Sequence, residues 1–282
     1  MKRLLAAAAG TGLAALAGCK EGVLDPQGPI ALAELQILCD STGIMLAIVI
    51  PTMVATLGVA FWFRASNRRA HYRPDFEHSG RLELLVWAIP IMTVFLVGGV
   101  AWVGAHDLDP KKPIETAARP LRVQVISLDW KWLFIYPDEG VATVNQLTIP
   151  VGRPVNFELT GNGVMNSFFV PQLGSQMYTM AGMVNTLNLQ ADHAGRYAGL
   201  SAEFSGEGFA DMRFAVDAVS DADYAKWIAS AHAGGRSLDL DTYKQLARPS
   251  VAVAPTTYGH VPSNIFDSIV QTAALNCGVK RK

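Results

Sequence analysis

Two long stretches without a charged side chain, Ser41–Phe63 and Leu84–Ala105, dominate the pattern of hydrophobic and polar positions. A helix rises about 1.5 Å per residue, so about twenty apolar residues cross the roughly 30 Å of hydrocarbon in a bilayer. Each stretch contains a proline, Pro51 or Pro90, which a membrane helix tolerates because neighbouring helices can satisfy the freed carbonyl. The pattern therefore predicts a transmembrane hairpin over residues 41–106.

The loop that connects the two stretches, residues 64–82, is short and basic. Its arginines are Arg64, Arg68, Arg69, Arg73 and Arg81, and the acidic residues in and beside it are Asp75, Glu77 and Glu83. Short loops with an excess of arginine and lysine stay on the cytoplasmic side of a membrane. We therefore expect both outer ends of the hairpin to face the periplasm.

The N-terminus has the plan of a secretory signal. Lys2 and Arg3 precede a run of small apolar residues, which ends in Leu16–Cys19. That tetrapeptide resembles the lipobox of bacterial lipoproteins, where the cysteine receives a lipid and the signal is removed just before it. We predict a signal peptide over residues 1–18 and a lipid on Cys19; the alternative is an ordinary cleaved signal with a coincidental cysteine.

Beyond the hairpin the pattern changes. Prolines and lysines in residues 107–120 predict a stiff polar linker. Short alternating segments follow, separated by Gly, Pro and Asn, and they predict an antiparallel sandwich or barrel over residues 121–219. These strand candidates are centred on residues 122–128, 145–149, 155–159, 167–170, 186–189 and 213–216. Short helical patterns after Asp217 are interpreted as a peripheral extension, residues 220–282, and residues 19–40 as a periplasmic N-terminal segment.

Composition excludes several classes of function. Half of the 282 residues are hydrophobic and the formal net charge is −1, which gives no basic surface for a nucleic acid. Cys39 and Cys277 lack the spacing of a disulfide framework or a thiolate metal cluster. The six histidines are scattered without ligand spacing, so we expect no metal site built from them.

Three motifs follow the hairpin in a fixed order: Leu128–Trp132, Val164–Pro171 and Leu200–Met212. With the lipobox and the hairpin, they make the chain resemble subunit II of the haem–copper oxidases over nearly its whole mature length. The resemblance implies that residues 121–219 form a cupredoxin-like β-sandwich facing the periplasm. The expected fold is thus a membrane α hairpin of two transmembrane helices, an all-β cupredoxin-like sandwich and a small helical C-terminal extension.

In the branch of this family that oxidises cytochrome c, the sandwich holds two copper ions through two His, two Cys and a Met. Thiolates, imidazoles and a thioether suit copper that carries one electron at a time. The corresponding positions here are Asn166, Ser201, Ser205, Phe209 and Met212. An amide, two hydroxyls and a phenyl ring cannot hold the metal, and Met212 alone is insufficient. The resemblance therefore implies a sandwich without its redox site.

Loss of the copper relay makes the chain resemble the quinol-oxidising members, and the cytochrome bo-type ubiquinol oxidases more closely than the menaquinol oxidases. The resemblance implies a structural and assembly subunit of a proton-pumping quinol:oxygen oxidoreductase in the aerobic respiratory chain. We expect no cofactor on this chain and no catalysis by it alone. Haems and copper are expected in the partner subunit I, with subunits III and IV and membrane lipids as further partners, in the inner membrane.

Glu83 lies at the cytoplasmic start of the second apolar stretch. In the family, the matching glutamate is implied at the mouth of a proton path into the large subunit. The alternative is an interfacial charge that sets topology and pairs with Arg81, since a carboxylate at a membrane boundary costs free energy unless it is hydrated or paired. Both interpretations stay open at this point.

Two other functions compete with the quinol oxidase hypothesis. A cytochrome c oxidase subunit II would need a complete copper site, which the replaced positions disfavour. A free-standing membrane-tethered lipoprotein could use its sandwich to bind a ligand or a partner. Such a protein would not need a proline-containing hairpin in addition to its lipid, because a membrane helix alone anchors almost irreversibly.

Overall fold

The structure is a computed structural model, and it describes residues 22–71 and 73–276. The predicted signal peptide, Cys19 and Cys277 lie outside these residues. The described part divides into two compact units. One is formed by Glu34–Asp109, and the other by the residues on either side of that segment.

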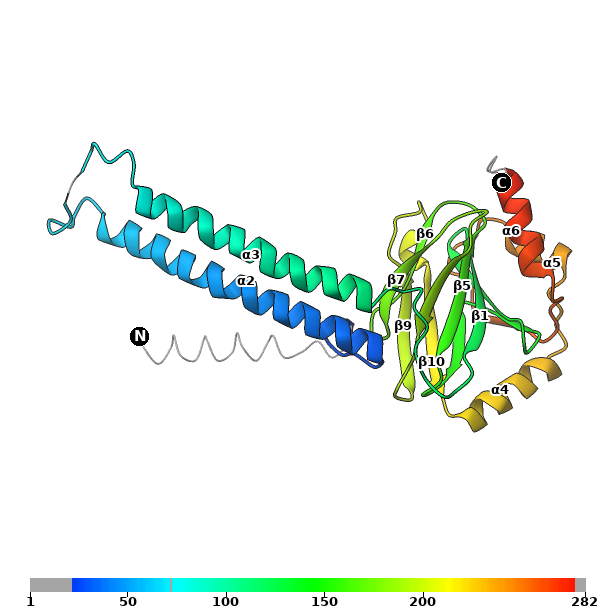
Figure 1. Ribbon diagram of the computed structural model, residues 1–282. Helices are drawn as coiled ribbons and strands as arrows, with labels where there is room; N and C mark the ends of the chain where they lie inside the picture. The colour runs from blue at the N-terminus through cyan, green and yellow to red at the C-terminus, as the bar shows by residue number, and fades with distance from the viewer. Residues whose placement is uncertain (1–21, 72, 277–282) are drawn as a thin grey trace, which may run out of the picture. The chain divides into compact units, whose positions relative to one another are not determined.

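The hairpin consists of α2 (Pro29–Trp62) and α3 (Gly80–Asp107), which run alongside each other (Figure 1). Both helices are long and apolar enough to cross a membrane, and no residue in their most apolar windows is buried within the protein. Their close approach is at Gly104, where a Cβ would lie 2.6 Å from Ile37 Cδ1. α2 begins twelve residues before the uncharged stretch and includes Glu34 and Asp40.

The sandwich consists of two sheets. The first is six-stranded, and its strands in spatial order are β11 (Thr256–Tyr258), β3 (Val141–Val144), β2 (Lys131–Tyr136), β1 (Leu121–Leu128), β5 (Val155–Gly161) and β8 (Asn185–Leu189). The second is five-stranded, in the order β4 (Gln146–Pro150), β10 (Arg213–Val219), β9 (Gly195–Ser201), β6 (Asn166–Val170) and β7 (Gly174–Thr179). β1 pairs with β5, and β4 with β10, in parallel, whereas the other pairs are antiparallel. The predicted cupredoxin-like sandwich is confirmed.

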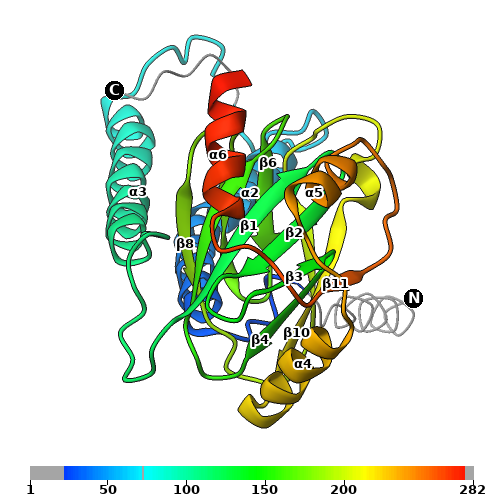
Figure 2. The ribbon, with the colours of Figure 1, turned by 90° about the vertical axis from the view of Figure 1, so that its right-hand side faces the viewer.

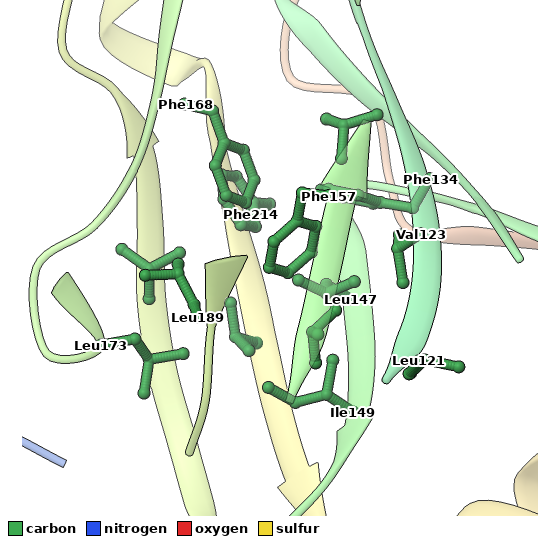
Figure 3. Close-up of a cluster of buried hydrophobic side chains, with 14 of the residues drawn as sticks. Leu121, Val123, Phe134, Leu147, Ile149, Phe157, Phe168, Leu173, Leu189 and Phe214 are labelled. Carbon is green, nitrogen blue, oxygen red and sulfur yellow. The ribbon is translucent and has the colours of Figure 1, made fainter. Parts of the chain in front are cut away.

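Aromatic rings fill the core between the sheets (Figure 3). Phe168 is fully buried at its centre and stacks on Phe214 with ring centroids 5.1 Å apart. Phe134, Phe157 and Trp132 contact the Phe168 ring at centroid distances between 5.3 and 6.3 Å. Because these residues come from both sheets, the packing of large apolar rings holds the two layers together.

The C-terminal segment forms a third layer and does not lie at the periphery. It contains α4 (Asp221–Ala233), α5 (Leu240–Leu246) and α6 (Ile265–Asn276), and Figure 2 shows α5 and α6 across the first sheet. The outward side chains of β1, β2 and β3 form a second buried apolar cluster with this segment. Its members include Ile126, Leu133, Ile135, Leu238, Phe266 and Ile269. Both faces of the first sheet are therefore buried.

Lys131 joins the C-terminal layer to the sheet. It points outward from β2, is fully buried, and donates hydrogen bonds from Nζ to Asp129 O, Arg248 O and Ser250 Oγ at 2.6 to 3.1 Å. Burial lowers the pKa of the ammonium group, and the nearby Asp129 charge opposes that shift. All three donors are used, so the cation satisfies its hydrogen-bonding capacity inside the protein.

Tyr136 connects the two sheets through one hydroxyl. Its Oη donates to Thr148 O at 3.0 Å and accepts from Thr148 N at 2.8 Å. Burial raises the pKa of the phenol far above its ordinary value, which keeps it protonated as a donor.

Tyr136→Phe is expected to lower the free energy of unfolding by about 2–4 kcal/mol, because two buried backbone groups of Thr148 lose a partner. Denaturant titration of the detergent-solubilised chain, followed by tryptophan fluorescence, measures this loss. Tyr258→Phe, on the partly exposed edge strand β11, is the matched control and should change stability little. Equal losses in the two variants would show that the link between the sheets contributes nothing specific.

Candidate functional site

The positions that correspond to copper ligands gather at one end of the sandwich. Asn166 opens β6 and Ser201 closes β9, and these strands pair with Phe168 opposite Ser201. Ser205 and Phe209 lie in the loop that follows β9, and Met212 immediately precedes β10. The fold thus brings together residues that are up to 46 positions apart in the chain, from 166 to 212.

Asn166 and Ser201 form a closed network of neutral hydrogen bonds. Ser201 Oγ lies 3.1 Å from Asn166 Oδ1 and 3.2 Å from Glu203 O, and Asn166 Nδ2 donates to Val164 O at 3.0 Å. The backbone N–H of Ser201 donates to Met212 O at 3.1 Å. Asn166 and Ser201 are each only 3% exposed, so their polar groups are satisfied inside the protein.

The remaining positions offer no replacement for a thiolate or an imidazole. Ser205 Oγ lies 3.9 Å from the sulfur of Met212, which is buried. The Phe209 ring packs edge-on against Phe204 with centroids 5.5 Å apart. Among the described residues, no group of three or more His, Cys, Asp or Glu could hold a metal ion. This donor set does not fit the copper centre of the fold family.

Trp130 supports the loop that carries these positions. It has a positive φ of 62°, and its indole N–H donates to Ser205 O at 3.1 Å. A Cβ on Gly208 would lie 2.5 Å from the indole Cγ, so only glycine lets the loop approach this closely. Trp132 is fully buried beside Phe168. Both tryptophans therefore have structural contacts.

An exposed apolar surface surrounds the same end of the sandwich, and the sequence pattern alone did not reveal it. It is formed by three loops, and we call it the loop-end patch; its members are Val164 and Met165 before β6, Met183 and Val184 before β8, and Phe204 after β9. Antiparallel pairing of Asn166 with Thr179, of Leu159 with Asn185 and of Phe168 with Ser201 places the three loops at one end. Phe204 is 73% exposed and Val164 57%. Exposed apolar side chains that gather at one end of a domain are a candidate interaction surface.

Glu83 lies in the first turn of α3, in the hairpin unit. Its Oε1 is 2.5 Å from His78 Nδ1, and 53% of its side chain is exposed. The Glu83 carboxylate therefore contacts His78, and among the described residues no ion pair joins it to Arg81. The carboxylate is thus held at the start of the helix by a residue of the connecting loop.

Two segments of the chain match known protein families. Residues 140–219 match the family described as cytochrome c oxidase subunit II, periplasmic domain, and residues 232–272 match the COX aromatic rich motif. A relative from Pseudomonas aeruginosa, named cytochrome bo(3) ubiquinol oxidase subunit 2, is 44% identical over 90% of this chain and 77% of its own. The ubiquinol oxidase subunit 2 of Acetobacter aceti is 45% identical over 90% of this chain and 83% of its own.

The chain belongs to the ubiquinol oxidase subunit 2 family. The quinol oxidase subunit 2 of Bacillus cereus is more distant, at 36% identity over 87% of this chain and 85% of its own. Among solved structures, the periplasmic domain of subunit II of the Bradyrhizobium japonicum cytochrome oxidase is 23% identical over 41% of this chain and 96% of its own, with a TM-score of 0.39.

Membership of the ubiquinol oxidase subunit 2 family confirms that this chain is a subunit of an oxidoreductase complex. The aromatic rich motif coincides with the C-terminal layer that covers the first sheet, from the end of α4 to within α6. Two of its members, Tyr243 and Phe266, are buried in the second apolar cluster. In this chain, residues of the motif therefore pack the C-terminal layer against the sandwich.

Proposed function

We propose that this chain is the subunit II, without a redox centre, of a proton-pumping quinol:oxygen oxidoreductase that uses ubiquinol. The observation that supports this most strongly is the neutral network at the copper-ligand positions. Asn166 and Ser201 bond to each other, while the sandwich around them is retained. The identity of the relatives, higher for the ubiquinol oxidases than for the Bacillus enzyme, supports ubiquinol as the substrate of the complex.

The route of electron delivery explains why a quinol oxidase does not need the copper site in this subunit. A soluble cytochrome c gives up its electrons at the periplasmic surface, so a metal must relay them inward. A quinol is soluble in the membrane and reaches the large subunit directly. In this proposal the haems and the copper belong to subunit I, and this chain binds no cofactor.

The loop-end patch supports a covering role for the sandwich. Its apolar side chains lie on the loops beside the former copper positions, and we assign them to the contact with subunit I. The two membrane helices expose apolar side chains along their whole spans, which lipid and the helices of partner subunits would cover. Subunits III and IV are the further partners in this proposal.

The anchoring of the chain belongs to the same proposal. It lies in the inner membrane, with the sandwich in the periplasm, the loop 64–82 in the cytoplasm and a lipid on Cys19. The basic composition of that loop supports this orientation. Mass spectrometry of the mature N-terminus would detect the lipid on Cys19, and an unmodified Cys19 would contradict this part of the proposal.

Gentle detergent purification through a C-terminal tag tests the proposed assembly. We expect the chain to bring down a haem-containing subunit, with one copper per complex. Three coppers per complex would indicate the cytochrome c oxidase alternative. Recovery of the chain without haem would favour the free-standing lipoprotein.

Glu83 is proposed to take up protons for subunit I. Its position at the start of α3 and its partly exposed carboxylate beside His78 support this role. Glu83→Gln is expected to lower quinol-driven oxygen uptake about tenfold or more, because an amide cannot release a proton. Haem content should stay unchanged. The matched control is Glu77→Gln in the exposed loop, and equal activities of the two variants would contradict the role of Glu83.

A further inference from the structure

Two histidines that are far apart in the chain lie next to each other in the sandwich unit. His232 is in the last turn of α4, and His260 lies two residues after β11. Their ring centroids are 5.8 Å apart, and both residues are exposed to solvent. Because 28 positions separate them in the chain, the spacing of the histidines in the sequence does not reveal this pair.

The backbone around the pair is closely packed. A Cβ on Gly259 would lie 2.2 Å from Ala231 O and 2.9 Å from His232 Cα, so this segment is in direct contact with the end of α4. Gly259 N and His260 N both donate to Arg236 O, at 2.9 and 3.3 Å. Both rings are therefore attached to one fixed frame, and little ordering is needed to bring them to a shared ligand.

The hydrogen bond of the His232 ring leaves its other nitrogen available as a ligand. His232 Nδ1 lies 2.7 Å from Gly259 O. A carbonyl oxygen can only accept, so Nδ1 carries the proton, and in the neutral imidazole Nε2 then has a free lone pair. Histidines that bind metal ions usually donate their other N–H to a carbonyl or carboxylate in this way, which orients the ring.

The separation of the two rings suits a single metal ion between them. With metal–nitrogen bonds of about 2.0–2.1 Å, two imidazoles on one ion have ring centroids about 5–6 Å apart, the larger value at wider bond angles. The observed 5.8 Å falls in this range. Imidazole nitrogen suits Zn²⁺, Cu²⁺ and Ni²⁺, whereas Mg²⁺ and Ca²⁺ prefer oxygen ligands.

We propose that His232 and His260 bind one Zn²⁺ ion, with water in its remaining coordination positions. Zn²⁺ has no geometric preference from its d electrons, so it accommodates the angle that the two rings impose. In the part of the chain that the structure describes, no group of three or more His, Cys, Asp or Glu could hold a metal ion. With two protein ligands the ion is exchangeable and is not a resident cofactor. When bound, it fastens the end of α4 to the segment that follows β11.

Titration calorimetry with ZnCl₂ on the full detergent-solubilised chain, purified through a tag without histidine, tests this site. We expect saturable binding that His232→Gln and His260→Gln each weaken about tenfold or more, because each removes one of two ligands. His232→Gln keeps an N–H that can donate to Gly259 O, and His260 is exposed, so both variants should fold. His193→Gln, at an exposed position before β9, is the matched control and should bind Zn²⁺ like the unaltered chain.

Denaturant titration with and without Zn²⁺ gives a second readout. An ion that binds only the folded chain stabilises it, so Zn²⁺ should move the unfolding midpoint of the unaltered chain to higher denaturant. It should leave the midpoint of the double variant, His232→Gln with His260→Gln, in place. Mg²⁺ at the same concentration should shift neither chain.

Three results would overturn the proposal. Zn²⁺ binding that persists undiminished in the double variant would place the ion elsewhere, for example at His78 and Glu83. Equal weakening by His193→Gln would show that the pair is not a specific site, and absence of saturable binding would show that there is none. These measurements use neither oxygen uptake nor haem, so they are independent of the proposed oxidase function.

Discussion

Phe168→Ala is expected to lower the free energy of unfolding of the sandwich by about 3–5 kcal/mol, the usual cost of truncating a buried aromatic side chain. Phe168 is fully buried and its ring contacts those of Trp132, Phe134, Phe157 and Phe214. These rings are closely packed, so they cannot move far enough to fill the space that the truncated Phe168 side chain would leave. Denaturant titration of the solubilised chain, followed by tryptophan fluorescence, measures the loss.

Phe204→Ala is the control for this measurement. Phe204 is 73% exposed, so its truncation should cost less than about 1 kcal/mol. If Phe168→Ala lowered the free energy of unfolding as little as Phe204→Ala, the aromatic core would not be the main connection between the sheets.

Charges on the loop-end patch are expected to separate this chain from its haem-containing partner. In the double variant Val164→Asp with Phe204→Asp, each carboxylate would have to lose its water at an apolar contact, which costs several kcal/mol. Haem recovered with the tagged chain should fall at least about tenfold. Haem absorbance per tagged chain after gentle purification measures the effect.

The matched control for the patch is Leu240→Asp. Leu240 is 48% exposed at the start of α5, on the C-terminal layer, and does not belong to the three loops that form the patch. It should leave the haem yield unchanged, and unfolding curves of all variants should coincide with that of the unaltered chain. If the double variant retained the same haem per tagged chain, the loop-end patch would not be the contact with subunit I.

The sequence predicted the hairpin and several strands well because their patterns are simple. Uncharged stretches identify membrane spans directly, and β1 and β5 alternate as expected. β2 was missed because the C-terminal layer covers its outer face, so Leu133 and Ile135 are as buried as Trp132 and no polar alternation remains. β9 was missed because Gly195 and Gly199 interrupt its pattern. Its Gly199 is required where Phe214 packs, since a Cβ would lie 2.2 Å from that ring.

The sequence predicted only those residues of the candidate site that lie in the three motifs. The resemblance to subunit II of the haem–copper oxidases predicts that Asn166 and Ser201 lie in one site. The structure places them in hydrogen-bond contact. The support of the loop by Trp130 depends on a positive φ and on a bond to a residue far along the chain, and neither leaves a sequence pattern. Glu83 contacts His78 across the start of α3 at Gly80, where the preceding Ser79 is extended.

Oxygen uptake by the purified complex tests the central claim most directly. The same preparation would be supplied in turn with ubiquinol and with reduced cytochrome c. The neutral network around Asn166 and Ser201 predicts rapid uptake with ubiquinol and none above background with cytochrome c. Uptake driven by cytochrome c and independent of quinol would contradict the account.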